Sequence, residues 1–269
     1  MALHGAIDDA TGIVTAAIFR PTEDLWGYLM MMEKGIRQYG VPLALYSDQH
    51  TIFFSPQTPL SIEQEVAGET DVLTQFGAAL SELGIEHIRA RTPQAKGRIE
   101  RLWETFQGRL LIELRIRHVC TLVDANAVLD ELVAKHNHQF AVRPEDSESA
   151  YRPAPDDMPL AHRLCRRETR MVTPAQTVSY HRTVYRLEAT ISHSLPARTT
   201  VQVRQTMQGI LVVYHEGVCY SLHPMVSAPR ANQASTPAVV KSGPKTPPAA
   251  DHPWRTYKTP PKQRTATTS

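Results

Sequence analysis

The stretch Thr92-Pro93-Gln94-Ala95-Lys96-Gly97-Arg98-Ile99-Glu100-Arg101-Leu102-Trp103 decides which fold the first half of the chain predicts. After Pro93 and Gly97, apolar residues return every three or four positions, which is typical of an amphipathic helix. They are Ile99, Leu102, Trp103, Phe106, Leu110 and Leu111. Glu100 lies outside this apolar stripe. Because the helix dipole favours an acid near a helix N-terminus, Glu100 is either an ordinary surface glutamate or a ligand for a cation.

A second acid follows an apolar run earlier in the chain. Residues Val41-Pro42-Leu43-Ala44-Leu45-Tyr46-Ser47-Asp48 predict a short, unbroken strand of the kind that is buried inside a sheet. Asp48 would then lie where the strand opens into a loop, at the edge where open α/β sheets place their sites. The alternative is that Asp48 is a turn or cap residue.

The rest of the first half predicts alternating strands and helices. We expect paired strands over residues 3–8 and 12–19, and a helix from Thr22 to Gly40. Further elements are a helix over residues 73–83, a strand over 85–90 and a helix over 123–138. The predicted fold class of this half is therefore α/β.

Four segments, in this order, resemble the catalytic core of DDE transposases and retroviral-type integrases, most closely the bacterial insertion-sequence group called ISNCY. They are His4–Gly12, Ala44–Asp48, Pro93–Arg101 and the helix ending at Lys135-His136-Asn137. The resemblance covers residues 1–152 and implies a ribonuclease-H-like mixed sheet with helices. It also implies that residues 92–97 form a mobile loop beside the active site.

The same resemblance implies three acids that hold two divalent ions, Mg²⁺ or Mn²⁺. Hard cations prefer oxygen ligands and keep open positions for phosphate and water. Two such ions activate the attacking hydroxyl and stabilise the leaving oxygen in phosphoryl transfer. Asp48 matches the second acid of the family and Glu100 the third, so the resemblance makes both of them catalytic residues and metal ligands in DNA transposition or integration.

The first acid of the family has no counterpart in this chain. It belongs to the opening strand of the sheet, one strand before the segment at which this chain starts. Asp8 and Asp9 correspond to the second strand, where we expect a structural role at the turn before Gly12. We therefore expect a truncated or mis-started transposase whose sheet lacks its first strand and which is inactive alone. The alternative is a non-catalytic DNA-binding or regulatory derivative of a transposase.

Basic residues flank Glu100. Lys96, Arg98 and Arg101 are candidates for phosphate contacts, which carry salt dependence but read no bases. A solvated basic helix face is the alternative for each of them. The expected partners are DNA, at the element ends and the target, and either further copies of the chain or a full-length transposase.

Beyond Pro153 the pattern changes to short alternating runs, which predict a small all-β barrel over residues 153–227. The connections His181-Arg182 and His215-Glu216-Gly217 read as hairpin turns. Eight arginines lie on the approach to the barrel or within it, and they would suit a DNA surface, a contact with another subunit or ordinary solvated strands. They are Arg163, Arg166, Arg167, Arg170, Arg182, Arg186, Arg198 and Arg204.

The last segment, residues 228–269, is rich in proline and carries seven basic residues against the single acid Asp251, so we expect a disordered tail. The formal net charge of the whole chain is only +2, too small to argue for DNA binding by itself. Three widely separated cysteines, Cys120, Cys165 and Cys219, fit neither a zinc pattern nor a disulfide framework. No apolar run is long enough for a membrane helix, and we expect a cytoplasmic, bacterial protein that joins the nucleoid when bound to DNA.

Overall fold

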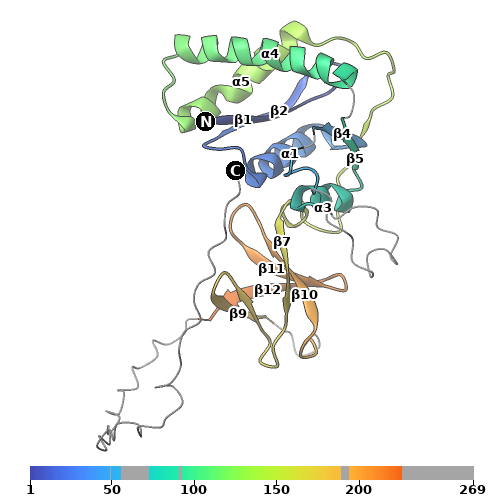
Figure 1. Cartoon of the computed structure of the whole chain (residues 1–269), viewed down its shortest axis with the longest axis vertical. Coiled ribbons are helices and arrows are strands. Elements are labelled where there is room, and N and C mark those ends of the chain that lie inside the picture. Colours follow the sequence, from blue (N-terminus) through green and yellow to red (C-terminus); the bar gives the residue numbers. More distant parts are fainter. Residues whose placement is uncertain (49, 56–72, 91–92, 189–193, 226–269) are drawn as a thin grey trace, which may run out of the picture. The chain divides into compact units, whose positions relative to one another are not determined.

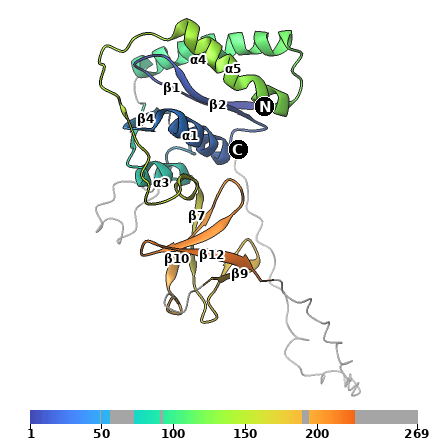
Figure 2. The same ribbon diagram turned by 180° about the vertical axis from the view of Figure 1, so that it is seen from behind.

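A computed structural model describes residues 1–48, 50–55, 73–90, 93–188 and 194–225, with residues 93–99 and 102 described by their backbone alone. Figure 1 shows the order of the elements along the chain, and Figure 2 shows them from behind. The helices and strands up to Phe140 belong to an α/β part, and the strands between Arg166 and Pro224 form a part made of antiparallel strands. The predicted tail, residues 228–269, lies outside the described residues.

The chain opens with an antiparallel hairpin of β1 (Ala2–Ile7) and β2 (Val14–Arg20), as the sequence predicts. Asp8 shapes the turn between them, because one of its carboxylate oxygens accepts hydrogen bonds from Thr11 N at 2.8 Å and Thr11 Oγ1 at 2.6 Å. Gly12 completes the turn with a φ of 70°. The other oxygen of Asp8 accepts a bond from the Tyr151 hydroxyl at 2.9 Å. Asp8 therefore has the structural role that was expected of it.

Helix α1 (Leu25–Tyr39) begins later than predicted, because Asp24 and not Thr22 caps it. The Asp24 carboxylate accepts from Gly27 N at 2.8 Å, and Arg20 holds it with an ion pair at 2.6 Å. Gly40 ends the helix with a φ of 96°, a left-handed conformation that favours glycine.

The predicted unbroken strand over residues 41–48 is wrong. The chain forms β3 (Val41–Pro42), which pairs with β6 (Tyr151–Arg152), and separately β4 (Ala44–Ser47), which pairs in parallel with β5 (Glu86–Arg89). Among the described residues β4 has a strand on one side only. Tyr46 is accordingly 54% exposed, although its apolar neighbours suggested an interior strand.

Helices cover both faces of the hairpin. On one face, α1 and α3 (Gln75–Glu82) share a core with residues of β2 and β4, including Ala16 and Leu45. On the other face, α4 (Pro93–Ile116) and α5 (Leu122–Phe140) bury Phe106 and Leu129 against Phe19 of β2. These layers confirm the α/β class. Since α4 begins at Pro93, residues 93–97 are helical and do not form the expected loop.

The α/β part does not contain one continuous sheet. Within the described ranges, β1 pairs only with β2, and β4 pairs only with β5, so two separate two-stranded ribbons lie against the layer of α1 and α3. One edge of β1 and one edge of β4 therefore carry backbone groups without a described strand partner.

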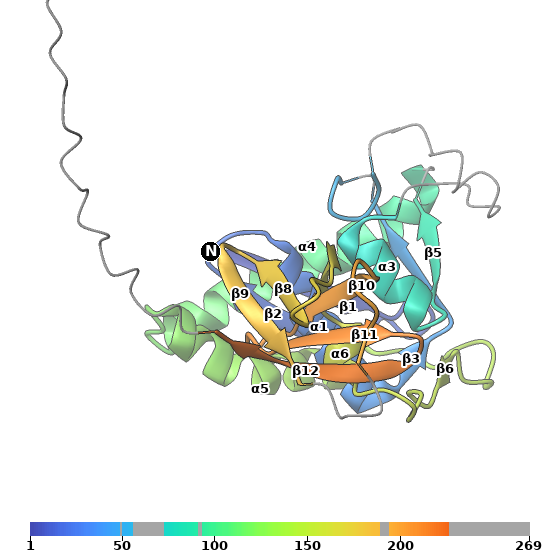
Figure 3. The ribbon, with the colours of Figure 1, turned by 90° about the horizontal axis from the view of Figure 1, so that it is seen from below.

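Where the sequence predicts a small barrel, the chain forms a nearly closed antiparallel sheet (Figure 3), which is called the barrel below. After the short helix α6 (Leu160–Arg163), six strands follow in the sheet order β7-β10-β11-β12-β9-β8, all antiparallel. They are β7 (Arg166–Met171), β8 (Thr177–Tyr180), β9 (Thr183–Leu187), β10 (Thr200–Gln205), β11 (Leu211–His215) and β12 (Val218–Pro224). Arg170 Nε of β7 donates to Ser179 O of β8 at 3.0 Å, so the two outer strands approach each other and the sheet is nearly closed. Its own apolar core includes Val178, Val203 and Val213.

Two further features concern the cysteines and the helices. Cys120, Cys165 and Cys219 are all free thiols. None of the helices in the described ranges combines the length and the apolar character needed to cross a membrane.

Candidate functional site

Asp48 lies directly after β4, exposed, at the edge where that strand and β5 both end. Its Oδ1 accepts a hydrogen bond from His50 N at 3.1 Å, which is the local turn contact that aspartate often makes. No hydrogen bond to Oδ2 is present among the described residues. Asp48 therefore stabilises its own loop with one oxygen, and the rest of its carboxylate faces solvent.

The end of β4 is held by a histidine on the neighbouring strand. Ser47 Oγ and His87 Nε2 lie 2.7 Å apart, and the His87 ring stacks on Phe54 with centroids 4.3 Å apart. Burial lowers the pKa of His87 to about 4, and the nearby Arg89 guanidinium contributes to this shift. His87 is therefore neutral near pH 7, and it fixes the residue that precedes Asp48.

Tyr28 of α1 contacts an acid that precedes that helix. Its hydroxyl donates to Glu23 Oε1 at 2.5 Å. Burial raises the pKa of Tyr28 far above its usual value, and the charges of Glu23 and Asp48 act in the same direction. The charge of Asp48 therefore acts on the Tyr28 hydroxyl, although less than that of Glu23.

Glu100 is exposed on α4, which begins at Pro93, four residues after the end of β5 at Arg89. Trp103 follows it by three positions, so the two side chains project from neighbouring parts of one helix face. The Trp103 ring lies directly over Gly5 of β1, where an added Cβ would meet ring atom Cη2 at 2.2 Å. Glu100 therefore lies one helical turn before the point at which α4 contacts β1.

The described residues do not bring three acids together. Within the ranges that the structure describes, no group of three or more His, Cys, Asp or Glu side chains is arranged to hold a metal ion. Asp8 is committed to Thr11 and Tyr151, and Asp9 is exposed in the same turn. Asp48 and Glu100 remain on separate elements, and their role as metal ligands stays a prediction.

The basic residues near Glu100 are only partly described. Lys96 and Arg98 lie in α4, but their side chains are outside the described residues. Arg101 is exposed, and its carbonyl accepts from Thr105 Oγ1 at 2.9 Å. Their contacts with DNA stay predictions.

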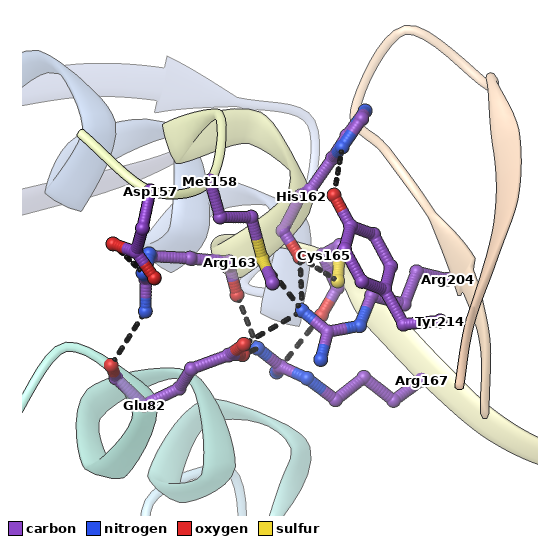
Figure 4. A network of polar contacts seen from close by, with 9 residues as sticks. All are labelled: Glu82, Asp157, Met158, His162, Arg163, Cys165, Arg167, Arg204 and Tyr214. Atoms are coloured by element: carbon purple, nitrogen blue, oxygen red, sulfur yellow. Dashed lines mark hydrogen bonds and ion pairs between the residues drawn. The ribbon is translucent and has the colours of Figure 1, made fainter. Parts of the chain in front are cut away.

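Sequence reasoning missed a polar network that joins α3 to the barrel (Figure 4). Glu82, the last residue of α3, accepts hydrogen bonds through its two carboxylate oxygens from Arg167 of β7 and, at 2.8 Å, from Arg204 of β10. Arg163 donates to the Glu82 carbonyl at 2.9 Å and pairs with Asp157 at 2.6 Å. These three arginines, offered above as a possible surface, are only 6–7% exposed. For them the prediction of a binding surface is wrong.

The network places positive charge where backbone carbonyls need donors. Cations are favoured at the C-terminus of a helix. The Arg163 guanidinium reaches the C-terminus of α3, where it donates to the Glu82 carbonyl. Arg204 also donates to His162 O at 2.8 Å and stacks 4.5 Å from the centre of the Tyr214 ring. No sequence signal pointed to Glu82, because its partners are 85 and 122 residues away in the chain.

Comparison with known proteins adds two relatives. The chain is 38% identical over 185 residues to a protein of Sinorhizobium fredii that is provisionally named transposase y4bF. It is 34% identical over 183 residues to a Streptococcus pneumoniae protein named transposase for insertion sequence IS1202. Each match spans 68% of this chain but only 38% of the relative. No protein-family model matches the chain.

Proposed function

We propose that this chain is the catalytic core and following barrel of a DDE-type transposase, which cuts and joins DNA by metal-dependent phosphoryl transfer. Both relatives carry the name transposase, one of them provisionally, and each match covers 68% of this chain. In this proposal Asp48 and Glu100 are two of the three metal-binding acids, and DNA is the substrate.

The observation that carries the proposal is the division of the sheet into two ribbons. β1 and β4 each have an edge without a described strand partner, yet residues of both ribbons pack into the same core below α1 and α3. One additional strand between β1 and β4 would join the ribbons into a single sheet of the ribonuclease-H type. Such a strand would run close to the Trp103 contact on Gly5, and therefore past the turn of α4 that carries Glu100.

The two acids fit a hard divalent cation. Asp48 offers an exposed carboxylate oxygen without a described partner, and Glu100 is exposed on the adjacent helix. Oxygen ligands with open positions for water and phosphate suit Mg²⁺ or Mn²⁺. Two bound ions would activate the attacking hydroxyl and stabilise the leaving oxygen. The chain's own part is to hold the two carboxylates, and His87 contributes by holding Ser47, the residue before Asp48.

In this account the added strand carries the third acid, and the present chain alone does not join DNA. The second candidate, a non-catalytic DNA-binding or regulatory derivative, agrees with the lack of a three-acid group among the described residues. The two candidates differ in one respect. Only the first predicts that a strand ending in aspartate, fused ahead of Met1, produces strand joining.

The test compares the chain alone with such a fusion, using labelled DNA that carries the ends of its own genetic element together with Mg²⁺ or Mn²⁺. The fusion should join strands, and Asp48→Asn or Glu100→Gln should abolish joining while the protein stays folded. Glu104→Gln, one turn further along α4, and Asp9→Asn are matched controls that should leave joining intact. Joining that survives Asp48→Asn or Glu100→Gln would remove that residue from the site, and joining by the unextended chain would exclude the need for a third acid.

A further inference from the structure

The groove between α4 and α5 contains a cavity that the proposed catalysis does not use. Figures 1 and 2 show the two helices side by side on one face of the hairpin. The cavity between them has a volume of about 370 Å³, which is within the range of pockets that bind small molecules. Its apolar lining includes Phe106, Leu110, Leu132 and Phe140, and its polar lining includes Arg109 and His136.

His136 is a buried polar residue without a partner. It is only 6% exposed, and neither Nδ1 nor Nε2 forms a hydrogen bond among the described residues. Its ring meets two aromatic rings instead, with centroids 5.0 Å from Phe106 and 4.8 Å from Phe140. Native proteins seldom retain a buried polar group that is unpaired, because it loses its bonds to water and gains none in return. Since His136 lines the cavity, a ligand there would supply the missing bond.

The protonation state of His136 limits the chemistry of that ligand. Burial lowers the pKa of His136, and the Arg109 guanidinium acts in the same direction. His136 is therefore neutral near pH 7, with one ring nitrogen that donates and one that accepts. A hydroxyl group suits either nitrogen, because it is both a donor and an acceptor.

Arg109 supplies a positive charge beside the same cavity. Its guanidinium lies 4.4 Å from the centre of the Phe140 ring, and Nη1 donates to Gln139 Oε1 at 2.8 Å. It has no ion pair with a carboxylate of the described residues. Glu113, the acid that lines the cavity, is held by Lys135 and lies 3.9 Å from Arg117. The remaining N–H groups of Arg109 can therefore bind a carboxylate with two parallel hydrogen bonds.

We propose that the cavity between α4 and α5 binds a small aromatic carboxylic acid with a hydroxyl group on its ring. The aromatic ring would lie on the apolar lining, the carboxylate would pair with Arg109, and the hydroxyl would bond to His136. One ring is long enough to reach both groups, because they flank the same Phe140 side chain at 4.4 Å and 4.8 Å. The bound acid would hold α4, the helix that carries Glu100, against α5. The inference does not depend on the proposed catalysis.

The test titrates the full chain with 4-hydroxyphenylacetate and follows binding by NMR. A ligand of this size that fits the cavity should bind with a Kd of about 1 mM or lower. Phenylacetate, which lacks the hydroxyl, and 4-hydroxyphenylacetamide, which lacks the charge, should each bind about tenfold more weakly. No saturable binding of the acid up to about 10 mM overturns the inference, as do equal affinities for the three compounds.

Two variants assign each contact to its residue. Arg109→Gln should weaken binding of the acid about tenfold and leave binding of the amide unchanged. His136→Phe should weaken binding of the acid by a similar factor and leave binding of phenylacetate unchanged. The matched controls are Arg115→Gln and His138→Phe, which change exposed residues of the same helices outside the cavity and should leave all affinities unchanged. Equal losses in the variants and their controls overturn the inference.

Two further measurements separate the proposal from its alternatives. His136→Phe removes two unpartnered nitrogens, so the thermal unfolding temperature should not fall; a clear fall would assign His136 to the fold and overturn the inference. N-acetyltyrosine carries the same ring, hydroxyl and carboxylate on a peptide group, and it should bind more weakly than the free acid. Tighter binding would assign the cavity to the terminus of a polypeptide and would equally overturn the inference.

Discussion

Replacing Glu82 should destabilise the protein strongly, because Glu82 is the counter-ion of two buried arginines between α3 and the barrel. Glu82 is the only carboxylate that contacts Arg167 and Arg204 among the described residues, and the side chains of those arginines are 7% and 9% exposed. Arginine does not lose its proton at accessible pH. Glu82→Ala would therefore leave two buried, charged guanidinium groups without a counter-ion.

The expected size of this effect follows from the burial of the three side chains. Removing one partner of a buried ion pair costs about 3–5 kcal/mol. Glu82 itself keeps 21% of its side chain exposed, so water screens part of the charge and about 3 kcal/mol is expected. Arg204 also retains its bond to His162 O, which limits the loss further.

Urea unfolding of the full chain measures this loss, with Asp157→Asn as the matched control. Asp157 also pairs with a buried arginine, Arg163, but its own side chain is 72% exposed. Its replacement should cost under about 1 kcal/mol, since exposed carboxylates contribute little. A triple replacement, Glu82→Leu with Arg167→Met and Arg204→Met, removes all three charges and should recover most of the stability. A loss for Glu82→Ala no larger than that for Asp157→Asn would show that Glu82 does not neutralise buried charge, and so would a triple variant that is less stable than Glu82→Ala.

Two further predictions concern the α/β part. Gly5→Ala would place a Cβ 2.2 Å from the Trp103 ring and should lower the free energy of unfolding by about 1–3 kcal/mol, which thermal unfolding measures. Gly108→Ala, on the same helix as Trp103, meets no atom within 4 Å and should stabilise the protein by up to about 1 kcal/mol. Equal effects of the two substitutions would contradict this packing. His87 has a pKa of about 4 when folded, below its usual 6.5, so the unfolded chain binds the proton more readily and stability should fall as the pH decreases from 6.5 to 4. The loss of stability over this pH range is at most about 3 kcal/mol. His87→Phe should remove this part of the pH dependence, and an identical pH profile in the variant would show that His87 is not its cause.

Much of the fold follows from local patterns in the sequence. The alternation in residues 177–187 predicts a hairpin with a turn at His181-Arg182, and the structure confirms it as β8 and β9. The helical spacing after Pro93 predicts α4, where Phe106 and Leu110 are buried, although Leu111 is 54% exposed. An apolar residue at every second position marks one side of a strand, and apolar residues spaced by three and four positions mark one side of a helix. Such patterns predict an element correctly when only one of its sides packs against the core.

The incorrect predictions concern features that depend on residues far apart in the sequence. Val41 to Ser47 is as apolar as an interior strand, but Leu43 breaks it, and β4 finds a partner on one side only among the described residues. Arg167 and Arg204 look like surface cations until the fold places Glu82 between them. For the same reason, the sequence alone does not tell whether Asp48 and Glu100 meet, since their meeting depends on how β4, α4 and any further strand are joined.

Backbone hydrogen exchange tests the central claim most directly, because it reports whether a strand fills the space between β1 and β4. In the chain alone, the outward-facing amides of β1 and β4 should exchange rapidly, while the amides that join β1 to β2 and β4 to β5 are protected. When a strand ending in aspartate is fused ahead of Met1, the outward amides of β1 and β4 should become protected together. Protection of neither edge, or of one edge without the other, would contradict the account.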